Sequence, residues 1–427
     1  MLQNTQQILN IAQTHGTPTY IYDFDKITHN VESFKTAFNA RKSLLCYALK
    51  ANSNLSILKH LASLDCGADC VSINEVKRAL KAGIPTYKII YSGVGKSDDE
   101  IKEALNLDIL FLNLESIKEM LRVEKIAESL GKIARISIRV NPNIDAKTHP
   151  YISTGLQENK FGVDLETAKK MFIYAKNSPH LQPIAVHFHI GSQLLELSPI
   201  IESVKKIVSL IKSLLALKID IKFIDVGGGL GIAYNDEKTI DLYDYAQGIL
   251  AELSGLDLTI ICELGRRIIG DCGILVAKVL YEKQNEFKRF CIIDAAMNDL
   301  IRPSLYNAKH KVILLKQDYS DEGEIPQLLC DNMESHKIAD IVGAICESSD
   351  YLAKNIALPQ TKHGDIIAIM DAGAYGFSMS SNYNSRLKCA EIAIKNGKTW
   401  LIRKRETFEE SLQNELDCLK EMEENIE

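Results

Sequence analysis

The sequence predicts an α/β protein made of a closed, eight-stranded parallel barrel wrapped by helices and a second, all-β domain. Between about residue 40 and about residue 265, short apolar runs rich in branched residues alternate with longer amphipathic stretches. Eight such runs occur, and this alternation requires parallel strands joined by crossover helices. Eight repeats match a (β/α)8 TIM barrel better than an open doubly wound sheet. After residue 275 the pattern changes to β-like runs with polar turns, which predicts a second domain of sandwich-like or barrel-like form.

The predicted barrel strands are short and alternate with stretches of helical periodicity such as residues 115–130 and 199–217. The eight strands are expected at residues 44–50, 69–73, 88–93, 109–113, 134–141, 185–191, 223–229 and 259–265. In barrels of this kind the chemistry gathers at the C-terminal ends of the strands. The unusual residues do lie at those ends: Lys50, Ser92, Gly93, Asn113, Asn141, residues 189–192, residues 227–229 and residues 263–266.

The second domain is predicted from β-like runs at residues 275–281, 289–294, 311–316, 341–345, 366–371 and 400–404. The strand-like run 19–22 precedes the first barrel helix and has no place in the barrel, so it is expected to pair with this domain. We therefore expect a barrel domain at residues 24–274. Residues 1–23 and 275–427 are expected to form the second domain, which ends in an acidic, helical tail.

Composition excludes several functional classes. Hydrophobic residues make up 46% of the 427 residues and charged residues 25%, as in an ordinary globular enzyme. A net charge of -6 gives no electrostatic footprint for nucleic acid, so a small-molecule partner is expected. No window has the apolar length needed to span a membrane, and the N-terminus lacks a basic head followed by an apolar stretch. Ten scattered cysteines indicate reduced thiols, and we expect a cytoplasmic protein.

Three strand ends together indicate a cofactor. Lys50 ends the first strand with no acidic residue in the ten positions before it; alone, it would more often be a solvated lysine. The run 227–229 follows the seventh strand, where backbone amides can approach a phosphate, although glycine clusters are more often tight turns. Glu263 and Arg266 follow the eighth strand, where they could form a plain ion pair. Together they suggest pyridoxal 5'-phosphate, with a Schiff base at Lys50 and an acid at the ring nitrogen.

The partner of the ring nitrogen indicates the reaction. A carboxylate such as Glu263 keeps that nitrogen protonated, so the ring can stabilise the carbanion left by loss of carbon dioxide. An arginine there would favour racemisation, so decarboxylation is predicted. His187 and His189 are two residues apart and hence on one face of the sixth strand. They could be core histidines, a zinc pair, or a platform stacked on the cofactor ring, and Ser192 supports the third reading because its hydroxyl can reach a phosphate.

Several long segments in the right order resemble the diaminopimelate decarboxylases, which belong to the alanine racemase-like pyridoxal phosphate enzymes. The matching segments are residues 47–52, 92–96, 145–155, 159–162, 187–193, 297–299, 302–306, 346–348 and 373–379. The resemblance implies that Lys50 carries the Schiff base, His189 is the ring platform and Cys346 returns a proton to the carbanion. The remaining implied cofactor contacts are Ser192, Gly228, Gly229, Glu263, Gly265, Arg266 and Tyr375.

The resemblance also implies a substrate and an assembly. Arg266, Arg302, Tyr306 and Tyr375 would grip the substrate, and Glu347 would face its distal ammonium group. Two arginines suit a substrate that keeps one carboxylate after losing the other, because a guanidinium pairs with a carboxylate through two hydrogen bonds. This favours meso-2,6-diaminopimelate, with L-lysine as the product. In this family Cys346 and Glu347 reach into the neighbouring subunit's active site, so a homodimer with shared sites is expected.

Alternatives remain open at this stage. Within the class, the substrate could be carboxynorspermidine or another basic amino acid, although residues 145–155 favour diaminopimelate. An inactive regulatory paralogue would have lost Lys50 or Cys346, and both are present. A barrel zinc hydrolase predicts bound metal instead of a cofactor. Ala296 and Ser349 stand where the family usually has glycine, which predicts strain of about 1 kcal/mol or more wherever a positive φ is required. Residues 142–164 are long enough to form a lid.

Overall fold

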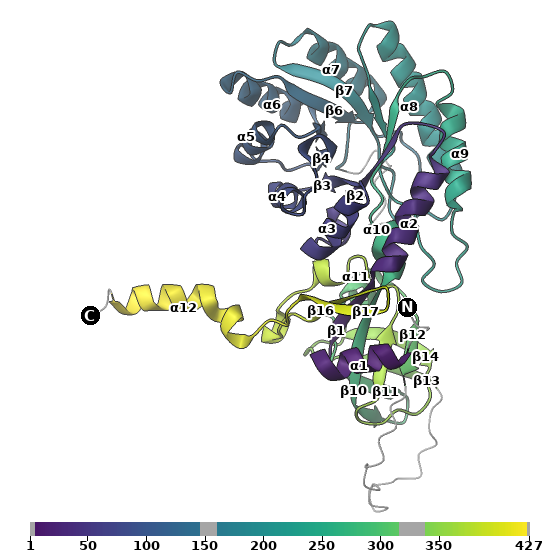
Figure 1. The fold of residues 1–427 in the computed structure, drawn as a ribbon, viewed down its shortest axis with the longest axis vertical. Helices are drawn as coiled ribbons and strands as arrows, with labels where there is room; N and C mark the ends of the chain where they lie inside the picture. Colours follow the sequence, from purple (N-terminus) through teal and green to yellow (C-terminus); the bar gives the residue numbers. More distant parts are fainter. Residues whose placement is uncertain (1–4, 146–159, 316–337, 425–427) are drawn as a thin grey trace, which may run out of the picture. The chain divides into compact units, whose positions relative to one another are not determined.

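The computed structural model describes residues 5–145, 160–315 and 338–424 (Figure 1). The chain divides into two compact units, and each is described by itself below. One unit is Lys26–Gly270, and the other combines Met1–Asp25 with Asp271–Glu427. Most of the possible lid at residues 142–164 lies outside the described residues. Among the described helices, none has the length and apolar character needed to cross a membrane.

The first unit is a closed parallel barrel, which confirms the predicted fold. Its strands are β2 (Ser43–Ala48), β3 (Gly67–Cys70), β4 (Ile89–Tyr91), β5 (Phe111–Leu114), β6 (Ala134–Arg139), β7 (Leu181–His187), β8 (Phe223–Asp225) and β9 (Thr259–Cys262). Each strand pairs in parallel with the next, and β2 pairs with β9 to close the barrel. Buried side chains from several strands fill it, among them Cys46, Ile90, Phe111, Ala185 and Ile261.

Within the described residues, one α-helix leads into the barrel, others connect its successive strands, and a short one follows the last strand. They are α2 (Phe24–Ala37), α3 (Leu55–Ser63), α4 (Ile73–Lys81), α5 (Asp98–Leu107), α6 (Ile117–Ser129), α7 (Leu165–Asn177), α8 (Ser198–Ala216), α9 (Leu242–Glu252) and the short α10 (Arg266–Ile269). The sequence encodes several of their starts locally. Ser72, Ser97 and Ser116 accept a backbone N–H at the first turns of α4, α5 and α6, and Glu100 completes a capping box with Ser97.

The sixth barrel strand differs from its prediction. It was expected at residues 185–191, but β7 begins at Leu181 and ends at His187. His189 therefore lies in the loop after the strand, and the expectation that His187 and His189 share one strand face is wrong. The start of β7 at Leu181 is hard to predict from the sequence because Gln182 and Pro183 interrupt the apolar run. The strand limits are set instead by the parallel pairing with β6.

The second unit is built on a nine-stranded sheet within the described residues. Its strands are β1 (Thr19–Asp23), β10 (Gly273–Gln284), β11 (Arg289–Ile293), β12 (Val312–Leu315), β13 (Ile338–Val342), β14 (Tyr351–Ala357), β15 (Ile366–Ile369), β16 (Ala390–Lys395) and β17 (Lys398–Arg403). β1 lies between β10, antiparallel, and β16, parallel. The α-helices in the described part of this unit include α1 (Thr5–His15), α11 (Arg302–Tyr306) and α12 (Phe408–Glu424).

The strain expected at two departures from the family pattern is absent. Neither Ala296 nor Ser349 has a positive φ, so a side chain at these positions meets no left-handed backbone penalty. Ala296 instead lies against Gly343, where an added Cβ would come within 2.4 Å of the Ala296 Cβ. The Ala296 methyl group therefore fits because Gly343 has no side chain.

Candidate active site

Lys50 lies in a single 3-10 turn, Leu49–Ala51, that directly follows β2. Its Nζ is 3.0 Å from Asp69 Oδ2, and the Asp69 side chain is fully buried. Asp69 is delivered by the neighbouring strand β3, where it pairs in register with Ala48. Burial raises the pKa of Asp69, as does nearby Glu263, while Lys50 acts in the opposite direction. The amine therefore has a buried carboxyl group beside it with which it can exchange a proton.

A second buried cluster lies at the ends of three neighbouring strands. His187 ends β7, Asp225 ends β8 and Glu263 follows β9, and atoms of the three side chains lie within 4.8 Å of one another. Glu263 Oε2 is 3.4 Å from His187 Nε2. Burial opposes ionisation of Glu263, but His187 and then Lys50 and His189 hold its pKa well below the usual value. Burial, followed by the charge of Glu263, raises the pKa of Asp225 well above its usual value.

These shifts separate the two carboxyl groups of the cluster. Glu263 is ionised at neutral pH, whereas burial and the charge of Glu263 favour the protonated form of Asp225. Among the described residues, Glu263 Oε1 is buried and has no hydrogen-bond partner. A buried anionic oxygen without a donor is unfavourable unless a ligand supplies one. The protonated nitrogen of a pyridine ring is such a donor, so Glu263 fits the ring-nitrogen role proposed from sequence.

The glycine run forms a close backbone cradle next to this cluster. A Cβ added to Gly228 would lie 2.2 Å from the Glu263 carbonyl oxygen, and one added to Gly229 would lie 2.2 Å from that of Gly191. Gly229 also has a φ of +101°, which favours glycine. The Gly227 N–H donates to Asp225 Oδ1 at 2.9 Å, so the cradle is tied to the carboxyl cluster. Only glycine fits here, as expected where a backbone must approach a phosphate closely.

His189 faces the cradle. Its Nδ1 accepts a hydrogen bond from the Gly228 N–H at 3.2 Å. Burial, the charge of Arg139 and that of Lys50 lower the pKa of His189 well below its usual value, so the ring is neutral. His189 is not among the side chains that lie close enough to Glu263 and His187 to share a metal ion with them. The group that could hold a metal contains His187, Asp225 and Glu263 instead.

Arg266 and Ser192 are joined by a hydrogen bond. Arg266 Nη2 donates to Ser192 Oγ at 3.1 Å, and its Nη1 donates to the Tyr234 hydroxyl. Gly265, which precedes Arg266, packs against the Lys50 turn: an added Cβ would lie 2.9 Å from the Ala51 Cβ. Eight residues of the predicted set thus gather at the C-terminal end of the barrel strands: Lys50, His189, Ser192, Gly228, Gly229, Glu263, Gly265 and Arg266.

Sequence reasoning missed four residues of this site, one of which is Asp225 in the buried cluster with Glu263. Asp69 pairs with Lys50, Tyr234 holds Arg266, and Arg139 ends β6 close enough to lower the pKa of His189. Arg139 is nearly buried and its Nη1 is 3.2 Å from Glu115 Oε1. Asp69 and Arg139 could have been predicted as site residues, because each is a charged residue inside or at the end of an apolar strand. Tyr234 gave no comparable signal.

The other predicted residues lie in the second unit. Arg302 begins α11 and is buried, and Tyr306 ends that helix. The Cys346 N–H donates to Asn384 Oδ1 at 3.0 Å. Glu347 is exposed, and its carboxylate accepts from Ser349 Oγ at 2.9 Å and from the Tyr383 hydroxyl, which together lower its pKa. Ser304 on α11 donates to the Ser349 carbonyl at 2.6 Å, which joins α11 to this loop.

Tyr375 also belongs to the second unit and has a positive φ of 58°. Such a backbone conformation is uncommon for a residue with a large side chain and concentrates at functional sites.

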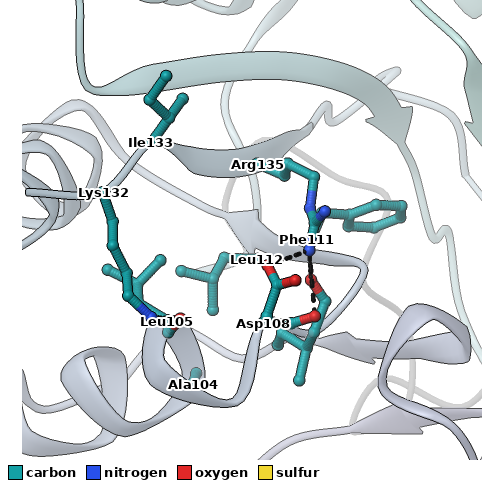
Figure 2. Close-up of a pocket in the computed structure, with 9 residues that line it drawn as sticks. Ala104, Leu105, Asp108, Phe111, Leu112, Lys132, Ile133 and Arg135 are labelled. Carbon is teal, nitrogen blue, oxygen red and sulfur yellow. Dashed lines mark hydrogen bonds and ion pairs between the residues drawn. The ribbon is translucent and has the colours of Figure 1, made fainter.

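A cavity of about 250 Å³ lies at the opposite, N-terminal ends of β5 and β6 (Figure 2). Lys132 Nζ donates to the Leu105 carbonyl at 2.9 Å, and Arg135 donates to Asp108 Oδ1 at 2.6 Å and to the Ile109 carbonyl at 2.7 Å. Figure 2 shows Arg135 directed at Asp108. Basic side chains at the C-terminal end of a helix stabilise its last carbonyl groups. The basic side chains that line this cavity therefore have a structural role at the end of α5.

Comparison with known proteins agrees with this geometry. Residues 24–270 match the family model described as pyridoxal-dependent decarboxylase, pyridoxal binding domain. The diaminopimelate decarboxylase of Helicobacter pylori is 58% identical over 410 residues, covering 96% of this chain and 98% of that protein. The corresponding protein of Campylobacter jejuni is 56% identical over 411 residues, again covering 96% of this chain and 98% of the relative.

Solved structures give the same result. The crystal structure of Helicobacter pylori diaminopimelate decarboxylase complexed with L-lysine has a TM-score of 0.89 and 57% identity, covering 96% of this chain and 100% of that one. The M. jannaschii diaminopimelate decarboxylase in co-complex with L-lysine has a TM-score of 0.87 and 34% identity, covering 95% and 94%. The chain therefore belongs to the diaminopimelate decarboxylase family of pyridoxal-dependent decarboxylases.

Proposed function

We propose that this chain converts meso-2,6-diaminopimelate to L-lysine and carbon dioxide, with pyridoxal 5'-phosphate as its cofactor. The observation that carries the proposal is the site at the C-terminal end of the barrel strands. It combines the Lys50 amine beside Asp69, a glycine cradle and an ionised, buried Glu263 with one unpartnered oxygen. The proposal is supported by relatives named diaminopimelate decarboxylase, two of which have structures complexed with L-lysine.

In this proposal, different barrel residues bind the aldehyde, the phosphate and the ring of the cofactor. When bound, pyridoxal phosphate supplies an aldehyde for a covalent bond to an amine and a ring that withdraws electrons from a departing carboxylate. Lys50 is the amine in this proposal, and Asp69 takes and returns its proton. The Gly229 N–H and the Ser192 hydroxyl bind the phosphate in this proposal. Gly228, whose own N–H donates to His189, contributes by having no side chain that would block the approach.

Glu263 would hold the ring nitrogen of the bound cofactor. The anionic Oε1 of Glu263 would accept a hydrogen bond from that nitrogen, and its charge would keep the nitrogen protonated. Burial and the charge of Glu263 raise the pKa of Asp225, which favours the neutral form of this carboxyl group beside the anion. His189 is neutral and tied to the cradle, which suits a flat ring platform that does not repel the protonated ring.

The substrate-binding and acid roles in the proposed reaction fall to Arg266 and to residues of the second unit. Arg302 binds the carboxylate that the substrate keeps, with Arg266, Tyr306 and Tyr375 as further substrate contacts. Glu347 binds the distal ammonium group; Ser349 and the Tyr383 hydroxyl orient its carboxylate for this. Cys346 then delivers a proton to the carbon that lost carbon dioxide.

The proposed working unit is a homodimer in the cytoplasm, in which Cys346 and Glu347 of one subunit serve the site of the other. All nine cysteines in the described residues are free thiols, which suits a reducing compartment.

The test is direct. The purified protein is incubated with pyridoxal phosphate, its visible spectrum is recorded, and carbon dioxide and lysine are measured after addition of meso-diaminopimelate. We expect a yellow protein and equal amounts of the two products. Carboxynorspermidine and L-ornithine serve as competing substrates. Faster turnover of either, or no turnover of meso-diaminopimelate by protein carrying the cofactor, would refute the proposed substrate.

A further inference from the structure

We infer that His310 is a positioning residue that fixes the guanidinium of Arg302 for substrate binding. Both side chains are buried, Arg302 to 6% exposure and His310 to 4%. Arg302 Nη1 lies 2.8 Å from His310 Nε2, and His310 Nδ1 lies 2.8 Å from the Met370 carbonyl oxygen. The inference rests on the proposed function, because it concerns the residue assigned there to the carboxylate that the substrate keeps.

The partners of the ring determine its protonation. A carbonyl oxygen can only accept, so His310 Nδ1 carries the hydrogen. A guanidinium can only donate, so Nε2 offers its lone pair. His310 is therefore a neutral ring in this arrangement, and it holds Arg302 without cancelling the positive charge.

The Met370 backbone, whose carbonyl oxygen contacts His310, is held by the sheet. Met370 directly follows β15, and its own N–H donates to the Lys311 carbonyl at 2.9 Å. The carbonyl that orients His310 thus belongs to backbone held between two chain segments. Arg302 sits at the start of α11, a helix of five residues that can contribute little rigidity itself. The two hydrogen bonds that link Met370, His310 and Arg302 tie the guanidinium to the sheet.

Holding an arginine in advance improves substrate binding because less side-chain freedom is lost when the carboxylate arrives. Loss of one hydrogen bond to a charged group changes an equilibrium by about tenfold or more. The interaction concerns the carboxylate that remains in both substrate and product. Its loss should therefore raise KM and weaken product binding while leaving the chemical step nearly unchanged.

Two substitutions separate the contacts of His310. In His310→Asn, the amide can still donate to the Met370 carbonyl but no longer reaches Arg302. In His310→Gln, the side-chain oxygen takes the place of Nε2 and can still accept from Arg302. We expect His310→Asn to raise KM for meso-diaminopimelate about tenfold, with kcat within about twofold. His310→Gln should restore KM to within about threefold of the original protein.

Each variant is also checked by thermal unfolding, by titration with pyridoxal phosphate, and by the inhibition constant for L-lysine. Unchanged unfolding and cofactor affinity, with KM and the lysine inhibition constant rising together in His310→Asn, would support the inference. An unchanged KM, or a loss of kcat and cofactor affinity instead, would overturn it. If His310→Asn does not fold, His310→Gln decides: a KM as high as that of Arg302→Ala overturns the inference. Failure of the unsubstituted protein to turn over meso-diaminopimelate would refute the proposed function, and the inference with it.

Discussion

Replacing Glu263 with glutamine removes the negative charge at the proposed ring-nitrogen site while keeping nearly the same shape. Glu263 is 6% exposed and ionised, and its Oε2 lies 3.4 Å from His187 Nε2. A protonated ring nitrogen at a hydrogen-bonding distance of about 3 Å from this carboxylate would interact with it by roughly 5 kcal/mol at an effective dielectric constant of about 20. A neutral amide retains part of this through its dipole. We therefore expect a loss of about 3 kcal/mol, which lowers kcat on the order of 100-fold.

The assay measures kcat at saturating meso-diaminopimelate together with the affinity for pyridoxal phosphate. Glu263→Asp is the matched control because it keeps the charge and moves it by one methylene group, so its kcat should fall less than that of Glu263→Gln. Thermal unfolding of both variants excludes a general loss of structure. A Glu263→Gln variant whose kcat stays within about threefold of the original protein would refute the electrostatic argument.

Three further outcomes are expected. Gly229→Ala adds a Cβ 2.2 Å from a carbonyl oxygen at a φ of +101°, so affinity for pyridoxal phosphate should fall at least about tenfold, measured by titration of the cofactor-free protein. Cys346→Ala should bind the cofactor normally but slow turnover about 100-fold, and an unchanged rate in a product assay would contradict its role as the acid. Glu282→Gln leaves the buried Arg289 guanidinium without its carboxylate and should lower the free energy of unfolding by about 2–4 kcal/mol at pH 7. The pKa of Glu282 is lowered in the folded protein, so ionised Glu282 stabilises the fold fully above the usual pKa of a glutamate and less as the pH falls. In urea unfolding, the difference in free energy between the variant and the original protein should therefore be smaller at pH 3 than at pH 7.

The barrel could be predicted because its signal is local and repeated. Alternation of short apolar runs with amphipathic helices determines parallel pairing, and the strand ends then gather Lys50, the glycine run and Glu263. The predicted strands extended beyond most of the observed ones because the apolar runs continue into the loops that hold these residues. His189 was assigned to a strand for this reason, whereas it lies beyond the end of β7.

The partners of the site residues were harder to predict. Asp69 reaches Lys50 because β2 and β3 are neighbours in the barrel, although the two residues are far apart in sequence. Tyr234 reaches Arg266 through a loop whose course the sequence does not specify. Which side chains share a buried cluster depends on strand register, and single-sequence periodicity does not give register.

Two strands of the second unit were also missed, for compositional reasons. β14 contains Lys354 and Asn355 in its middle, and β16 begins with Ala390 and the buried Glu391. These residues weaken the strand signal. Glu391 is accommodated because Tyr22 donates to it at 2.9 Å and Arg403 forms an ion pair with it. Contacts between distant parts of the chain therefore override the local preference.

The central claim is that Lys50 forms the covalent bond to the cofactor. Reduction of the yellow protein with sodium borohydride fixes such a bond, and peptide mass spectrometry then locates the pyridoxyl group. We expect the label on the peptide that contains Lys50, and its loss in Lys50→Ala. A label on another lysine, or an unlabelled protein that is nevertheless active, would contradict the account.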